Sequence, residues 1–152
     1  MNKYLHYGTL LLLSAAMLSA CQTTVDEEQK GVFIITNQSG QDLELKIYST
    51  RNRQQLPLSL RLPNTTSVER VSYGGAGNIA YPELFSQGDS VRLLFQDGKQ
   101  LLHYCPQAQQ IGDQCLPVRN LLALNQYQVE ALNEQTSRFS YTITAADYAL
   151  AR

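Results

Sequence analysis

Most of the chain beyond residue 30 consists of short segments in which every second residue is apolar. The pattern is clearest in the segments 43–48, 90–96 and 139–144, where polar residues fill most intervening positions. A β-strand turns successive side chains to opposite faces, so each segment has one face for a core and one for solvent. The connections are short and rich in turn residues. The pattern therefore predicts an all-β chain with mostly antiparallel strands.

The first predicted strands lie in the N-terminal half. Residues 32–36 form a continuous apolar run, which is typical of a central strand covered on both faces. Residues 43–48 follow after a polar turn, and the two segments together predict a hairpin. In the segment 56–62, Pro57 cannot donate a hydrogen bond to a neighbouring strand, which favours an edge position. A further strand is predicted from Val68 to Tyr73.

Two more hairpins are predicted in the C-terminal half. The first joins residues 90–96 to residues 99–104 through Asp97-Gly98. This dipeptide is the strongest short hairpin signal, because a type I′ turn needs positive φ at both central positions. The second hairpin joins residues 127–131 to residues 139–143.

The C-terminus carries a helix signal. Thr144 and Asp147 have the spacing of a capping box, which predicts a short helix continuing to Ala151. The fold class expected from these elements is all-β. We expect a single small antiparallel β-sandwich or barrel-like domain of about eight strands with a short C-terminal helix.

A different kind of segment precedes this domain. Residues 8–20 carry no charge and centre on four consecutive leucines. A helix needs about 20 such residues to cross a bilayer, so the run is too short for a span and has the length of a signal-peptide core. It ends at Leu18-Ser19-Ala20-Cys21, which resembles the lipobox of bacterial lipoproteins. The alternative is an ordinary secretory signal cleaved near Ala20, with Cys21 there by chance.

The resemblance implies cleavage between Ala20 and Cys21, a diacylglyceryl thioether on the Cys21 sulfur, and a fatty acyl group on its new amino terminus. Two or more acyl chains hold a protein stably on a membrane. In the Gram-negative lipoproteins that this segment resembles, Asp directly after the cysteine retains the protein in the inner membrane. Gln22 stands there instead, which implies an outer-membrane anchor with the domain facing the periplasm.

This interpretation divides the chain into three parts. Residues 1–20 are a signal peptide, residues 21–30 are the lipidated cysteine with a flexible polar tether, and residues 31–152 form the β-domain. With the signal peptide and its single lysine removed, 11 Lys and Arg and 13 Asp and Glu give a net charge of −2. Nucleic-acid binding would need a strong positive excess or a basic stripe, so no nucleic-acid partner is expected.

Two cysteines remain after Cys21. An even pair in an exported protein predicts a disulfide, and the polar, turn-rich segment between Cys105 and Cys115 allows its ends to meet. Closing so short a ring contributes about 2.5–3 kcal/mol. A metal site needs three or four ligands, and His103 is the only histidine of the mature chain, so no metal or cofactor is expected.

The candidate binding loop is Tyr73-Gly74-Gly75-Ala76-Gly77, continued to Tyr81. Tyrosine offers a large amphipathic contact area with few rotatable bonds, and glycine allows close approach of the backbone. The alternative is that both tyrosines pack inward and the glycines only turn the chain. A second candidate surface is the group of arginines at 51, 53, 61 and 70, whose alternative is an ordinary solvated surface.

The same loop, with Gly88-Asp89, Gly98-Lys99 and Cys105, resembles membrane-bound lysozyme inhibitors, whose glycine-containing loop enters the enzyme cleft. The serine expected beside the loop glycine is missing here, and the segment after Cys115 has no counterpart. The mature domain otherwise resembles no family.

The sequence contains no nucleophile motif, and His103 has no evident catalytic partner. The prediction is therefore a non-enzymatic binding or accessory module that contacts an envelope protein, with no catalytic residue. One alternative is a periplasmic lysozyme inhibitor. The other is a hydrolase whose acidic residues are dispersed in the sequence.

Overall fold

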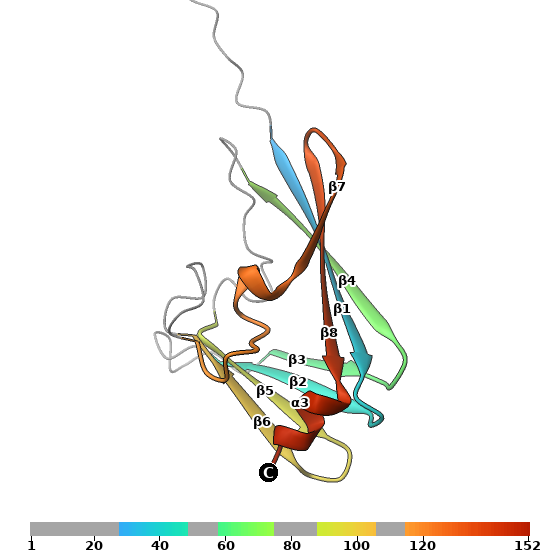
Figure 1. Cartoon of the computed structure of the whole chain (residues 1–152), viewed down its shortest axis with the longest axis vertical. Coiled ribbons are helices and arrows are strands. Elements are labelled where there is room, and N and C mark those ends of the chain that lie inside the picture. Colours follow the sequence, from blue (N-terminus) through green and yellow to red (C-terminus); the bar gives the residue numbers. More distant parts are fainter. Residues whose placement is uncertain (1–27, 49–57, 75–87, 106–114) are drawn as a thin grey trace, which may run out of the picture.

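The structure is a computed structural model, which describes residues 28–48, 58–74, 88–105 and 115–152 (Figure 1). Eight strands form two four-stranded sheets that pack together as a sandwich, as predicted, with a short C-terminal helix. Sheet A has the order β4-β1-β8-β7 and sheet B the order β3-β2-β5-β6. The elements are β1 Gln29–Gln38, β2 Leu43–Tyr48, β3 Leu58–Leu62, β4 Ser67–Gly74, β5 Ser90–Phe95, β6 Gln100–Tyr104, a 3₁₀ turn Leu124–Gln126, β7 Gln128–Asn133, β8 Thr136–Thr144 and α3 Ala145–Leu150.

Sheet A is built around its first and last strands. β1 pairs antiparallel with β4 and parallel with β8, so that Phe33 lies beside Phe139. Their rings stack with centroids 4.6 Å apart, and Tyr127 meets Phe33 edge-on at 5.9 Å. β1 is thus the central strand that its continuous apolar run predicts, with Val32 buried and Ile34 half-buried on its outer face.

The predicted first hairpin is wrong, because β1 and β2 belong to different sheets. The fully buried side chain of Asn37 explains the crossover. Its Nδ2 donates to the carbonyls of Gln41 (2.8 Å) and Leu62 (2.9 Å), and its Oδ1 accepts from the backbone and hydroxyl of Ser39. These bonds direct the chain out of sheet A and tie the turn to β3 in sheet B.

The other two predicted hairpins are confirmed, since β5 pairs with β6 and β7 with β8. The turn at Asp97-Gly98 is nevertheless not type I′, because only Gly98 has positive φ (89°). Gly98 N donates to Phe95 O, and Phe95 N donates to Lys99 O, which is the pattern of a type I turn followed by a left-handed glycine. The Asp97 carboxylate accepts a hydrogen bond from the Tyr148 hydroxyl (2.7 Å), which lowers its pKa.

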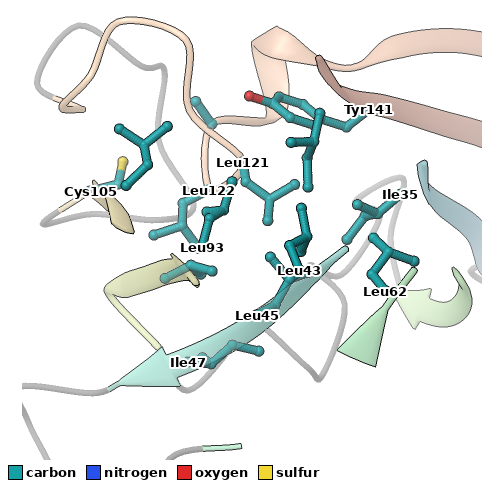
Figure 2. Packing of buried hydrophobic residues seen from close by; sticks show 14 of the residues in the cluster. Ile35, Leu43, Leu45, Ile47, Leu62, Leu93, Cys105, Leu121, Leu122 and Tyr141 are labelled. Atoms are coloured by element: carbon teal, nitrogen blue, oxygen red, sulfur yellow. The ribbon is translucent and has the colours of Figure 1, made fainter. Parts of the chain in front are cut away.

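The core lies between the two sheets (Figure 2). Side chains from sheet B, among them Leu45 and Leu93, face Ile35 and Tyr141 of sheet A, and Leu121 and Leu122 fill one side from the segment after the disulfide. β3 is an edge strand, as predicted. Within the described residues, no helix is both long and apolar enough to cross a membrane.

The predicted capping box and helix are confirmed. The Asp147 carboxylate accepts hydrogen bonds from Thr144 N (2.7 Å) and Thr144 Oγ1 (3.1 Å). After α3, Arg152 forms two backbone hydrogen bonds with Gln100 at the start of β6. The end of the chain therefore covers part of the edge of sheet B.

Replacing Asn37 with alanine should destabilise the protein by about 2–4 kcal/mol, because buried polar groups of the crossover lose their partner. Urea unfolding of the wild type and variant measures the difference. Asn133→Ala is the matched control, since Asn133 is exposed and its side chain accepts one hydrogen bond, from Gln135 N. If Asn37→Ala lowers the free energy of unfolding no more than Asn133→Ala does, the role given to Asn37 in the crossover is contradicted.

Candidate functional site

The outer edge of sheet B carries an unusual group of exposed apolar side chains. β6 turns Leu101 and His103 inward, where both are buried, and turns Leu102 and Tyr104 outward. Leu102 is 52% exposed, although large apolar side chains on a solvated sheet face are more often buried or absent. On the neighbouring strand β5, Arg92 lies directly opposite Leu102.

The predicted disulfide between Cys105 and Cys115 is present, and both cysteines are buried. Just outside it, Tyr104 and Leu116 exchange two backbone hydrogen bonds of 2.7 and 2.8 Å. The two residues are therefore directly opposite each other, so the Leu116 side chain, 66% exposed, lies on the same face as Tyr104. The Asn120 amide donates to both carbonyls and holds this bridge from inside.

We use the name β6 surface for Arg92, Leu102, Tyr104 and Leu116. Its arginine lies over the Tyr48 ring, with the guanidinium carbon 5.3 Å from the ring centroid. Within the described residues, Arg92 forms no ion pair with a carboxylate. The surface thus combines three exposed apolar or aromatic side chains with a cation that a ligand can reach.

A polar cluster around the buried Asp147 carboxylate holds the segment that follows the disulfide. Arg119 donates through Nε to the Asp147 carboxylate (3.0 Å) and through a terminal nitrogen to Thr142 O, and its guanidinium lies 4.8 Å from the Tyr141 ring centroid. These contacts tie the segment after the disulfide to β8 and α3. Burial raises the pKa of Tyr141, so its hydroxyl stays protonated.

His103 lies fully buried behind the same strand. Its Nδ1 accepts a hydrogen bond from Leu121 N (3.0 Å), while Nε2 has no partner among the described residues. Burial lowers the pKa of His103 to about 4; the nearby Arg119 adds to this and Asp147 opposes it. The ring is therefore neutral at pH 7 and serves as a structural acceptor for the backbone.

The structure places only part of the candidate binding loop. Tyr73 lies at the end of β4 opposite Lys30, on the outer face of sheet A, and is 56% exposed. Its side chain does not pack inward. Gly74 is half-buried, whereas Gly75, Gly77 and Tyr81 lie outside the described residues, as do Ala20 and Cys21. Tyr73 belongs to a different sheet from the β6 surface.

The predicted arginine group does not form one surface. Arg61 lies on sheet B opposite Glu44, whereas Arg70 lies on sheet A opposite Phe33. Arg51 and Arg53 lie outside the described residues.

Sequence reasoning missed the β6 surface, although a signal was present. Residues 99–104 do not alternate cleanly, since Leu101 and Leu102 stand side by side and Tyr104 follows. Apolar side chains on both faces are typical of a strand that is covered on both faces. The bridge to Leu116 could not be read from the sequence.

Comparison with known proteins places the chain in no group, since no family model, curated protein or solved structure matches it. Across the described residues, no group of three or more His, Cys, Asp and Glu is close enough to hold a metal ion.

The burial of His103 predicts a pH dependence of stability. The unfolded chain binds a proton with a pKa near 6.5 and the folded protein near 4, so the unfolded state binds more protons between these values. The titration of His103 leaves the free energy of unfolding unchanged above about pH 6.5. Between pH 6.5 and 4 it lowers this free energy by about 3 kcal/mol in total. Urea unfolding at pH 7, 5.5 and 4.5 measures it.

His103→Gln is the matched variant, because glutamine keeps an acceptor for Leu121 N but does not titrate. All other titratable groups are the same in both proteins. The difference between their two profiles of unfolding free energy against pH therefore isolates the contribution of His103. Parallel profiles would rule out this contribution.

Proposed function

We propose that the protein is a lipid-anchored envelope lipoprotein whose β-sandwich is a non-enzymatic binding module. Its anchor is lipid on Cys21, it resides at the outer membrane facing the periplasm, and its ligand is another envelope protein. The observation that carries the binding role is the β6 surface, an exposed apolar and aromatic group beside an arginine, held in place by a disulfide.

The composition of this surface favours protein recognition. Tyrosine and arginine are enriched at the centres of protein interfaces, where they contribute much of the binding free energy, and the two leucines add apolar area that a partner can bury. The disulfide and the Tyr104–Leu116 bridge fix the backbone on which these side chains stand. Association then costs less conformational entropy, because the surface is already ordered before the partner arrives.

The position of the first strand is compatible with an anchor at Cys21. Seven residues lie between Cys21 and Gln29, where β1 begins, and the eight steps from one to the other span about 29 Å at most in a fully extended chain. Figure 1 shows the start of β1 and the β7–β8 turn at one end of the molecule, with the β5–β6 turn and the C-terminus at the other. A lipid on Cys21 would therefore keep the first end near the bilayer and direct sheet B away from it.

Lipidation is tested by metabolic labelling with a radioactive fatty acid. The wild type should carry the label and Cys21→Ser should carry none, because the serine hydroxyl does not form the thioether. Ser19→Ala is the control, since a small residue at that position keeps the lipobox pattern and the label should remain. Equal labelling of Cys21→Ser and wild type would exclude the anchor at this residue.

Sorting is tested separately in a Gram-negative host by membrane fractionation. The wild type should appear in the outer-membrane fraction, and Gln22→Asp should move most of the protein to the inner membrane. Gln22→Asn, which has nearly the shape of aspartate without its charge, should remain with the wild type. Inner-membrane residence of the unchanged protein would refute the outer-membrane assignment and leave the lipid anchor intact.

A further inference from the structure

The β6 surface adjoins a positively charged part of sheet B. Arg92 lies between Leu102 on β6 and Lys46 on β2, and Ser90 lies between Tyr104 and Tyr48 in the next row. The outer face of the sheet thus changes from apolar at its β6 edge to cationic toward its centre.

The charges on this face are not balanced. Among the outward-facing side chains that the structure describes on sheet B, Lys46, Arg61 and Arg92 are cationic and only Glu44 is acidic. The Glu44 carboxylate is already engaged, since Lys46 lies 3.4 Å away and the Ser59 hydroxyl donates to it and lowers its pKa. Among the residues that the structure describes, Arg92 therefore contacts the Tyr48 ring and no carboxylate, in a mature chain whose net charge is −2.

From this arrangement we infer that the β6 surface binds an acidic, apolar segment of a partner protein. A partner carboxylate pairs with the Arg92 guanidinium, whose planar donors match it in a bidentate geometry, and apolar side chains cover Leu102, Tyr104 and Leu116. This inference rests on the proposed binding function and specifies the chemistry of its ligand.

The structure also indicates that the partner contacts the face of sheet B rather than adding a strand to it. Both ends of the β6 edge are occupied, since Gln100 pairs with Arg152 and Tyr104 pairs with Leu116 through backbone hydrogen bonds. A strand adding to this edge would have to displace one of them.

Two other occupants fit less well. A second copy packed face to face would bring Lys46 and Arg92 against the same cations, and such like-charge contacts cost free energy. A bilayer would lie near the start of β1 if Cys21 is the anchor, whereas sheet B extends toward the other end of the molecule (Figure 1). Charge complementarity therefore favours an acidic protein segment.

The test is site-specific photocrosslinking of the full lipidated protein in living cells. A photoreactive phenylalanine analogue at position 102 should yield a crosslinked protein, and the crosslinked peptide, mapped by mass spectrometry, should contain Asp or Glu beside apolar residues. The same analogue at position 129, an exposed apolar site on β7 of sheet A, is the control and should not yield that product.

Charge variants decide whether Arg92 makes the contact. Arg92→Glu should lower the crosslink yield at position 102 about tenfold or more, whereas Arg70→Glu, at an exposed arginine of sheet A, should leave it unchanged. Exchange of the mapped partner carboxylate for lysine should restore the yield with Arg92→Glu. Resistance of each variant to limited proteolysis, together with an intact disulfide, shows that the sandwich has folded.

Other results would overturn the inference in distinguishable ways. A crosslink to a second copy, to lipid, or to a protein whose yield does not depend on Arg92 would assign the surface to a different occupant. No protein crosslink at position 102 but one at position 73 would reject this surface and keep the binding function. The absence of a protein crosslink at both positions would reject the binding function as well.

Discussion

The parallel pairing of β1 with β8 is the constraint on which the rest of the structure depends. It places the first and last strands of the sandwich side by side in the middle of sheet A. On the core side of this pair, the Phe33 ring stacks on the Phe139 ring. Because β8 leads directly into α3, the same pairing fixes the helix and the terminal Arg152 against sheet B. Sheet A is therefore complete only after β8, near the C-terminus, has paired with β1, near the N-terminus. Forming this contact costs the closure entropy of the long chain segment between them.

That pairing shows where the sequence ceases to be informative. Periodicity identifies which side chains of residues 139–144 face a core, and the assignment is correct at Phe139, Tyr141 and Ile143. The continuous apolar run of residues 32–36 indicates a central strand but not which of its two faces meets the core. It does not identify the strand that lies alongside, since nothing local distinguishes one apolar partner from another. Local hairpins could be predicted because the turn supplies the pairing, as at Asp97-Gly98, even though the turn type differed. The first hairpin was wrong because a single buried side chain, Asn37, redirects the chain, and its hydrogen bonds join residues far apart in the sequence.

The candidate site follows the same division. The disulfide could be predicted from the even number of remaining cysteines and the expected export of the chain, and it is present. The β6 surface has only a partial signal, the adjacent Leu101 and Leu102, because it is completed where Leu116 returns to pair with Tyr104 and no periodic pattern marks residues 115–120. Of the two alternatives that the sequence left open for Tyr73, the structure shows the exposed one, but Tyr73 lies on the other sheet. Tyr73 lies opposite Lys30 near the start of β1, whereas the β6 surface lies on the outer face of sheet B.

The rigidity of the β6 surface comes from groups that do not lie on it. The Arg119–Asp147 ion pair connects the segment after Cys115 to α3, and the same carboxylate caps that helix through Thr144. Asp147 is almost completely buried, whereas the Arg119 side chain is partly exposed. Removing Arg119 is therefore more costly than removing Asp147, because it would leave the buried carboxylate without a compensating charge. The neutral His103 ring holds the backbone of Leu121 next to this pair. The exposed leucines and tyrosine therefore stand on a backbone that is held by a disulfide on one side and by the half-exposed Arg119–Asp147 ion pair on the other. The proposed partner would gain this contact area without having to order it.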